Sequence, residues 1–418
     1  MNFNRSSHPS KLKITDLRFA IVGHENWRWP LLKLYTNQGI TGLGEVRDGA
    51  SVRYALMLKS RVLGENPCSF EKVFRKIKQF GWHGRQGGGV CGIEMALMDL
   101  AGKAYGVPVY MLAGGKYRDR VKVYADTPSQ LEPDFMSERL KSRISQGYQF
   151  LKMDLGIDLL KNIKDTLIQN PKVATDPNLM HPFTGTQITR KGIDHLADYA
   201  RIIRERVGDA VPIAIDHFGH IGLDSCIRLG LALDPFVFAW YEDMLPWQFP
   251  AQLRALKQAV KTPICTGEDI YLRDDFKVLM EEECVSYIHP DLATSGGILE
   301  TKKIGDLGRD YGVAMVLHQA GSPVVAMANV HCAAASENFV ALEMHFADLE
   351  WWEDLILCKK KPIVEDGHIE VPEEPGLGIE LNEEMIKEHL NGPTPESSGF
   401  FDPTTDWDLM DSHDRLWS

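Results

Sequence analysis

The feature that most constrains the fold is a series of short apolar segments that recurs from Val121 onward. Amphipathic helical patterns such as FPAQLRALKQAV and GILETKKIGDLGRDYG separate these segments, which have the length and composition of β-strands. The eight segments are VKVYAD, QFLKMD, PIAID, FAWYED, PICTGED, SYIHPD, AMVLH and VALEMH. Strands that alternate with helices predict a parallel α/β sheet, and eight such units predict a TIM-type barrel with its active site at the carboxyl ends of the strands.

The first 120 residues have a different, α+β pattern. PLLKLYTNQGITGLGEV predicts a hairpin with arms at 31–35 and 40–46, and a helical region follows at 51–79. CGIEMALMDLAGKAYG predicts a helix with one apolar face (Ile93, Ala96, Leu97, Leu100) that ends at Gly106. We therefore expect one domain over residues 1–120 and the barrel over 121–349, with residues 350–418 packing back on the first domain. The gap from 155 to 212 is long for one unit, and we expect an inserted loop there over the barrel mouth, including residues 181–192.

Composition excludes several classes of function. The net charge of −12 argues against nucleic acid and anionic membranes as main partners, although a bound cation could still attract an anionic substrate. The seven cysteines are scattered without a Cys-x-x-Cys motif, which indicates reduced thiols in a cytoplasmic protein. No apolar run approaches the length of a membrane span, and the N-terminus lacks the apolar core of a signal peptide.

Polar residues follow the predicted strands one after another. Lys152 and Asp154 end the second strand, and from the third strand onward one such residue follows each strand: Asp216, Glu242, Glu268, Asp291, His318 and Glu343. Because the carboxyl ends of barrel strands meet at one rim, these side chains should lie together. The carboxylates of Asp216, Glu242 and Glu268 would repel one another unless a cation sat between them, and three oxygen ligands without Cys or His point to Mg²⁺.

The remaining side chains of this rim fit proton-transfer chemistry. His318 is a base whose ordinary pKa lies near neutrality, and Asp291 could hydrogen-bond its far ring nitrogen and fix the tautomer. Lys152 could stabilise a developing oxyanion. Glu343 could donate a hydrogen bond to a substrate carboxylate if its surroundings raise its pKa.

These motifs resemble those of the enolase superfamily, in its mandelate racemase-like subgroup. The resemblance rests on TNQGITGLGEV, GIEMALMDLAGKAYGVPVYMLAGG, EEPGLGIELNEE and the rim residues above, and it covers nearly the whole chain. It implies a modified (β/α)₇β TIM barrel with an N-terminal α+β capping domain. It also implies Mg²⁺-assisted removal of the proton α to a carboxylate through an enediolate, and a homo-oligomer.

Two departures from the subgroup bear on the reaction. Many members carry Lys-x-Lys at the end of the second strand, where the second lysine is a base, but this chain has Lys152-Met153-Asp154. Racemisation needs a base on each face of the substrate, so Asp154 in that place favours elimination by His318 alone. Asp154 could instead contact a substrate hydroxyl or pair with Lys152.

The second departure is DHFGH. Some sugar-acid dehydratases of the superfamily place a catalytic histidine two residues after the first metal ligand, where this chain has Phe218. His217 and His220 flank it, and strand alternation puts residues 216, 218 and 220 on one face if the strand extends so far. The acid that protonates the leaving hydroxyl therefore stays open among His318, His217 and His220.

In this subgroup two loops of the capping domain set substrate specificity, and GHENWRW and GWHGRQGGG correspond to them. The candidate substrate contacts in these loops are His24, Trp27, Trp82, His83 and Arg85. Arginine suits a carboxylate, and tryptophan suits a sugar face. The alternative is a pair of flexible surface loops, each with one packed tryptophan.

The function expected from the sequence is thus a cytoplasmic, Mg²⁺-dependent acid-sugar dehydratase that acts on an aldonate or aldarate and yields a 2-keto-3-deoxy acid. One alternative is a cycloisomerase or epimerase that uses the same enediolate. Another is a binding protein that keeps the metal site without turnover. The expected partner is a small sugar acid.

Overall fold

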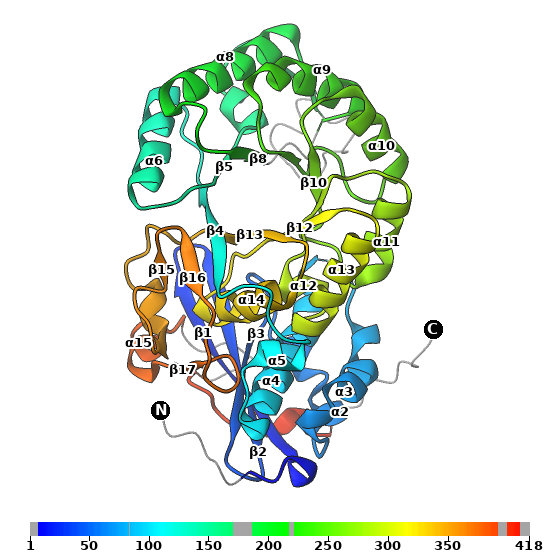
Figure 1. Ribbon diagram of the computed structural model, residues 1–418, viewed down its shortest axis with the longest axis vertical. Helices are drawn as coiled ribbons and strands as arrows, with labels where there is room; N and C mark the ends of the chain where they lie inside the picture. Colours follow the sequence, from blue (N-terminus) through cyan, green and yellow to red (C-terminus); the bar gives the residue numbers. More distant parts are fainter. Residues whose placement is uncertain (1–6, 83, 170–185, 217–220, 392–398, 410–418) are drawn as a thin grey trace.

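The computed structural model describes residues 7–82, 84–169, 186–216, 221–391 and 399–409. Its dominant feature is a closed barrel of eight parallel strands, in which the last strand pairs with the first (Figure 1). In order around the barrel the strands are β4 (Arg120–Thr127), β5 (Leu151–Asp154), β8 (Ile213–Asp216), β9 (Tyr241–Glu242), β10 (Ile264–Thr266), β11 (Tyr287–Ile288), β12 (Ala314–Leu317) and β13 (Phe339–Met344). The predicted barrel is confirmed.

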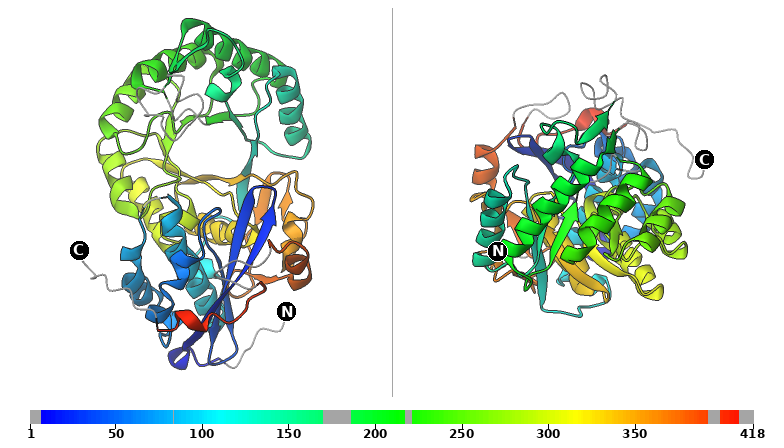
Figure 2. Two further views of the ribbon diagram at one scale, coloured as in Figure 1. Left: turned by 180° about the vertical axis from the view of Figure 1, so that it is seen from behind. Right: turned by 90° about the horizontal axis from the view of Figure 1, so that it is seen from above.

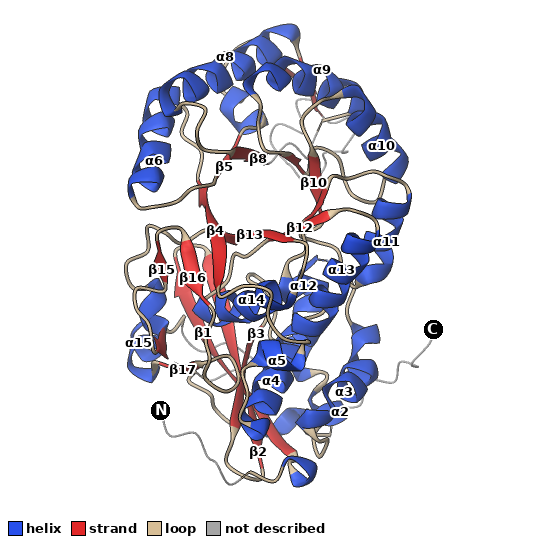
Figure 3. Ribbon diagram, viewed as in Figure 1, coloured by secondary structure: helices blue, strands red, loops and turns tan. Residues whose placement is uncertain are grey.

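Helices surround the barrel on its outer side (Figure 3). Among the described residues, one long helix connects each strand to the next, and after β13 the described chain leaves the barrel, which gives the expected (β/α)₇β arrangement. These helices are α6 (Pro133–Ser145), α8 (Arg190–Val207), α9 (Leu223–Leu233), α10 (Pro250–Ala259), α11 (Arg273–Glu281), α13 (Ile298–Asp310) and α14 (Pro323–Ala335), with a short additional helix, α12 (Leu292–Ser295), after β11.

The barrel interior is built in two layers. The lower layer is apolar and aromatic: Tyr124, Phe150, Ala214, Trp240, Cys265, Val316 and Ala341 form one buried cluster. The upper layer is polar. Its side chains lie two residues further along six of these strands, and they are Asp126, Lys152, Asp216, Glu242, His318 and Glu343. Because side chains alternate across a strand, each polar residue lies on the same inward face as its apolar neighbour, one layer nearer the carboxyl ends.

The capping domain contains an antiparallel sheet of β1 (Ile14–His24), β2 (Trp27–Thr36) and β3 (Thr41–Glu45), so the predicted hairpin is confirmed. Helix α4 (Gly88–Tyr105) packs on β3 so closely that a Cβ at Gly44 would lie 2.0 Å from the carbonyl oxygen of Gly92. Gly106 ends this helix with φ +72°. The four residues of the predicted apolar face are buried, and nearly all the rest of α4 is buried as well, between the sheet and the barrel.

The helical region predicted over 51–79 is not continuous. It contains α1 (Arg53–Leu56), α2 (Lys59–Val62) and α3 (Phe70–Ile77). Gly64, with φ +77°, and Pro67, which begins a 3₁₀ turn, interrupt the helix. A further short helix, α5 (Val109–Leu112), leads from this domain to the barrel.

The chain after the barrel contacts both domains (Figure 2). Strands β14 (Ile356–Cys358) and β17 (Ile379–Leu381) pair with each other, and α15 (Glu383–Glu388) follows. Strand β16 (His368–Glu370), paired with β15 (Val364–Glu365), also adds to β4 of the barrel. Beyond α15, the amide of Phe401 donates to the carbonyl of Phe19 in β1 at 2.7 Å.

The long gap between β5 and β8 carries a pair of short antiparallel strands, β6 (Leu167–Gln169) and β7 (Thr186–Ile188). Residues 170–185 between them, and so part of the predicted insertion 181–192, lie outside the described residues. Among the helices that the structure describes, none is both long enough and apolar enough to cross a bilayer.

Candidate active site

Lys152 is the centre of the polar layer. Its Nζ lies 2.7 Å from Asp216 Oδ2, 2.9 Å from Glu242 Oε1 and 2.6 Å from Glu343 Oε1, and all four side chains are buried. Burial lowers the pKa of Lys152, but the three carboxylates outweigh it and raise that pKa well above its ordinary value. The three carboxylates therefore favour the charged ammonium form of Lys152.

Glu268, on the loop after β10, stands between the acids and the predicted base. Its Oε2 is 3.1 Å from His318 Nε2. Burial and the nearby carboxylate of Asp216 raise the pKa of Glu268 to about 7, against the opposing effect of Arg47. Asp243 adds a further carboxylate: burial, then repulsion from Glu268, Glu242 and Asp216, raises its pKa well above the ordinary value.

Asp291 and His318 come together as a dyad at the ends of β11 and β12. Asp291 Oδ2 lies 2.6 Å from Nδ1 of His318, and the other oxygen, Oδ1, accepts a hydrogen bond from the amide of Ala293 at the start of α12. Burial, and next the charge of Arg47, lowers the pKa of His318 well below 6.5. His318 is therefore a neutral imidazole with Nε2 turned to the acids, which is the state that can accept a proton.

Sequence reasoning missed Arg47, which follows β3 of the capping domain. Its guanidinium donates to Asp291 Oδ2, and its Nη1 lies 3.1 Å from Asp48 Oδ1 and 3.3 Å from His318 Nδ1. The side chain is 2% exposed. No periodicity marks an arginine after a capping-domain strand as part of a barrel site, since only the docking of the two domains brings it there.

Glu343 differs from its predicted protonation state. Burial raises its pKa, but Lys152 and then His345 lower it to about 2. The condition for a neutral hydrogen-bond donor is therefore not met in this structure, and Glu343 is an ionised acceptor. The prediction was conditional on a raised pKa, and the sequence does not show that an ammonium lies 2.6 Å away.

His345 and Asp126 are two further members that sequence reasoning missed. His345 Nδ1 lies 3.2 Å from Asp126 Oδ2, and His345 Nε2 lies 3.3 Å from Glu343 Oε1. Both residues are the last letters of strand segments identified from the sequence, VALEMH and VKVYAD. The sequence therefore contained a signal for both residues. Asp126 is the polar residue that ends the first strand segment, and His345 is a second polar residue at the end of the eighth, two positions after Glu343.

The other predicted site residues divide into three groups. The first group, which contains Trp27, Arg85 and Asp154, lies near the residues described above. Trp27 lies beside the site, with its ring centroid 5.8 Å from that of His345, and Arg85 lies 3.6 Å from Asp48 and 3.5 Å from Asp269. Asp154 accepts a hydrogen bond from Ser129 Oγ at 3.3 Å, beside Asp216 in the pairing of β5 with β8.

The second group contains His24 and Trp82. His24 packs edge-on against Trp351, with ring centroids 5.7 Å apart, and Trp82 is 66% exposed. The third group, His83, His217 and His220, lies outside the described residues.

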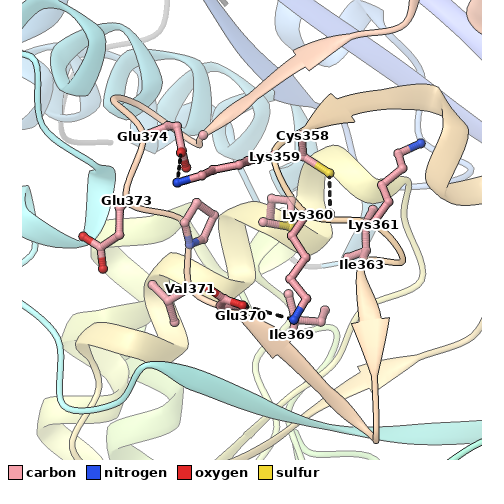
Figure 4. A pocket seen from close by; sticks show the side chains of 13 residues that line it. Cys358, Lys359, Lys360, Lys361, Ile363, Ile369, Glu370, Val371, Glu373 and Glu374 are labelled. Carbon is pink, nitrogen blue, oxygen red and sulfur yellow. Dashed lines mark hydrogen bonds and ion pairs between the residues drawn. The ribbon is translucent and has the colours of Figure 1, made fainter.

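A cavity of about 410 Å³ lies away from the barrel mouth, beside β14, β16 and α14 (Figure 4). Its lining lysines are paired with acids: Lys359 with Glu374 at 3.4 Å, and Lys360 with Glu370 at 3.2 Å. It contains none of the strand-end groups described above, so we place the chemistry at the barrel mouth.

Comparison with known proteins matches two stretches of the chain to family models. Residues 8–114 match the model of the mandelate racemase / muconate lactonizing enzyme N-terminal domain, and residues 136–385 match that of the enolase C-terminal domain-like family. The chain belongs to the enolase superfamily. Within it, the match to both models places the chain with the mandelate racemase / muconate lactonizing enzymes, as the sequence motifs predicted.

Several members of this superfamily resemble the chain over nearly its whole length. D-xylonate dehydratase of Haloferax volcanii is 33% identical, over 90% of this chain and 89% of the relative. D-galactonate dehydratase of Xanthomonas campestris pv. campestris is 28% identical, over 91% of this chain and 95% of the relative. The crystal structure of a mandelate racemase/muconate lactonizing enzyme-like protein from Rubrobacter xylanophilus superposes with a TM-score of 0.82 at 30% identity, covering 94% of this chain and all of that one.

Proposed function

We propose that this chain is an acid-sugar dehydratase, a hydro-lyase that converts an aldonate or aldarate into a 2-keto-3-deoxy acid. The observation that carries the proposal is the buried dyad of Asp291 and His318, whose Nε2 faces a group of carboxylates. A neutral, oriented imidazole beside a strongly charged cavity is suited to removing a weakly acidic proton α to a carboxylate. The relatives named D-xylonate dehydratase and D-galactonate dehydratase support the same reaction class.

We assign Asp216, Glu242 and Glu268 as the ligands of a Mg²⁺ ion. The chemistry of the donors suits this ion, because all three residues offer carboxylate oxygens at successive strand ends. The charges of the site support the same assignment. The carboxylate of Asp216 raises the pKa of Glu268, as expected of acids that lack a cation between them. Of the three proposed ligands, the ammonium of Lys152 forms ion pairs with Asp216 and Glu242. Bound there, Mg²⁺ would supply the positive charge that favours enolisation of a carboxylate.

The side chains of the protein itself perform the remaining steps of the proposed reaction. His318 Nε2 accepts the proton from C2, and Asp291 holds the ring by its Nδ1. Lys152 supplies a fixed positive charge where negative charge develops on the substrate carboxylate. Asp154 stands where other members carry a second lysine base, so a single base acts and elimination is favoured over racemisation.

The class of substrate follows from the same site. A 2,3-dihydroxy acid offers both the acidic C2 proton and the C3 hydroxyl that leaves as water. Trp27 and Arg85 lie close enough to the barrel mouth to contact the sugar chain beyond C3. We propose D-xylonate and D-galactonate as the first compounds to test, because relatives carry these names.

The proposal also includes the cellular setting. All seven cysteines are free thiols, which supports a reducing compartment such as the cytoplasm. A homo-oligomer is the state that resemblance to the superfamily favours. Sedimentation of the purified chain measures it directly.

A substrate screen tests the function. The protein is incubated with Mg²⁺ and a set of aldonates and aldarates, including D-xylonate and D-galactonate. We expect at least one of these acids to form a 2-keto acid and to exchange its own C2 proton for solvent deuterium. Exchange without loss of water would favour a cycloisomerase or epimerase. Binding with neither exchange nor product would identify a catalytically silent protein and refute the proposal.

A further inference from the structure

The barrel mouth contains a second Asp–His pair that repeats the geometry of the first. Where the barrel closes, between β13 and β4, the carboxylate of Asp126 lies 3.2 Å from Nδ1 of His345. In the dyad of Asp291 and His318 a carboxylate likewise lies against Nδ1 of the imidazole. In both pairs the aspartate engages one ring nitrogen and leaves Nε2 for another partner, which is how an aspartate positions a histidine for proton transfer.

The two imidazoles converge on the same place. His345 Nε2 lies 3.3 Å from Glu343 Oε1, and His318 Nε2 lies 3.8 Å from Glu343 Oε2. The ring centroids of the two histidines are 5.6 Å apart. The Nε2 atom of His345 is buried and makes no hydrogen bond of good geometry with any described residue. The contact with Glu343 does not satisfy this buried donor as a hydrogen bond, and a substrate oxygen between the two rings would do so.

We propose that His345 is the catalytic acid that protonates the departing C3 hydroxyl, with Asp126 as its positioning residue. The inference rests on the proposed dehydratase function and assigns the step that the sequence left open among His318, His217 and His220.

The charges around His345 suit an acid. Burial lowers its pKa, but Asp126 and then Glu343 raise it to about 9, against the opposing effect of Lys152. His345 is therefore an imidazolium at neutral pH and carries the proton that the leaving oxygen needs. The base of the proposed reaction, His318, lies on the neighbouring strand end, and Asp291 holds its Nδ1.

The proton balance closes with these two residues. His318 Nε2 takes the C2 proton, and the electron pair of that bond moves reversibly into the substrate carboxylate to give an enediolate. In the next step this electron pair forms the C2–C3 double bond as the C3–O bond breaks. His345 Nε2 gives its proton to the leaving oxygen, which departs as water. The enol then loses its C2 hydroxyl proton to solvent while His318 returns a proton to C3, and solvent reprotonates His345.

This geometry also predicts the stereochemistry. The two rings extend from the neighbouring strand ends of β12 and β13. Both protons therefore move on one face of the substrate, and the elimination is syn. The C2 proton and the C3 hydroxyl of the preferred substrate should lie on the same side in the reacting conformation.

A substrate whose leaving group needs no proton provides the sharpest test. His345→Gln is compared with the wild-type protein on two substrates: the aldonate that the screen finds active, D-xylonate or D-galactonate, and its 3-deoxy-3-fluoro analogue. For the hydroxyl substrate we expect kcat of dehydration to fall about 10²- to 10⁴-fold, with exchange of the C2 proton retained. Release of fluoride from the analogue should stay within about tenfold of the wild-type rate, because fluoride leaves without protonation. His368→Gln, at a histidine remote from the barrel mouth, is the matched control.

The positioning role of Asp126 has its own readout. Asp126 raises the pKa of His345, so Asp126→Asn should move the alkaline limb of the kcat profile to lower pH, a shift that a purely structural change would not produce. The proposal is overturned if His345→Gln dehydrates at the wild-type rate, or if it loses dehydration, C2 exchange and fluoride release equally. A wild-type protein that neither exchanges nor dehydrates any acid sugar would instead refute the function on which the proposal rests.

Discussion

The guanidinium of Arg47 lies 3.3 Å from Nδ1 of His318, although the two residues belong to different domains. The same guanidinium donates to the carboxylate of Asp291. The capping domain therefore does more than cover the barrel mouth: it supplies the positive charge that balances the dyad aspartate. The dyad is therefore complete, with its balancing charge, only when the two domains are docked.

Arg47→Met is expected to destabilise the protein strongly. It leaves Asp291 buried without its cation, and removing one partner of a buried ion pair costs about 3–5 kcal/mol. The free energy of unfolding in urea measures this cost. Arg190→Met is the control, because Arg190 forms an exposed pair with Asp194 that should be worth less than about 1 kcal/mol. The double variant Arg47→Met/Asp291→Asn should lose less stability than the sum of its two single variants, and strict additivity would show that the two side chains are not coupled.

Magnesium is expected to raise the midpoint of thermal unfolding. A ligand that binds only the folded state at 100 times its Kd adds about 2.7 kcal/mol, which corresponds to several degrees. Asp216→Asn should abolish most of this increase because it removes a proposed ligand. Asp158→Asn, at an exposed acid, should respond to Mg²⁺ as the wild-type protein does. Equal shifts in all three proteins would place the ion elsewhere.

His318→Asn is expected to slow exchange of the C2 proton about 10²- to 10⁴-fold, since the variant lacks the base. Proton NMR in D₂O measures the exchange on the acid sugar that the screen finds active. The stabilisation by Mg²⁺ should remain, because His318 is not among the proposed ligands. Exchange at the wild-type rate would remove His318 from its assigned role.

The barrel and most of the polar layer were predictable because both follow from local, repeated patterns. Each strand segment ends in a polar residue, and the period of two places Lys152, Asp216, Glu242, His318 and Glu343 above the apolar layer. Such regularity depends only on the chain near each residue. The pattern can therefore be recognised in the sequence without knowledge of the tertiary structure.

What could not be predicted depends on contacts between segments far apart in the chain. Arg47 reaches the site only when the capping domain docks, and the ionised state of Glu343 depends on an ammonium from β5. The burial of α4 on all sides likewise follows from its place between two domains. Asp126 and His345 are a different case, since their positions at strand ends were visible and their meeting depends only on closure of the barrel between β13 and β4.

The contact of Glu94 between the two domains should affect how the free energy of unfolding depends on pH. Glu94 extends from α4 of the capping domain to the start of α13, where its carboxylate accepts hydrogen bonds from the amides of Ile298 at 2.6 Å and Leu299 at 3.1 Å. Burial raises the pKa of Glu94 to about 8 in the folded protein. In the unfolded chain the pKa is about 4.3. Between these values the folded state binds more protons than the unfolded state, so the free energy of unfolding should fall as pH rises from about 5 to 8.

Glu94→Gln removes this proton uptake and should flatten the decline. Urea unfolding at pH 5, 6, 7 and 8 measures it, and the benefit of the substitution relative to the wild-type protein should grow with pH. Burial also raises the pKa of Glu45, which accepts from Ser322 at the start of α14, to about 8, so some decline should remain in the variant. Glu65→Gln is the control, because Lys72 and Lys76 lower the pKa of Glu65 and its carboxylate is largely ionised in both states across this range. If Glu94→Gln and Glu65→Gln show the same slope as the wild-type protein, Glu94 is ionised in the folded state, and the amides of α13 stabilise its charge more than burial penalises it.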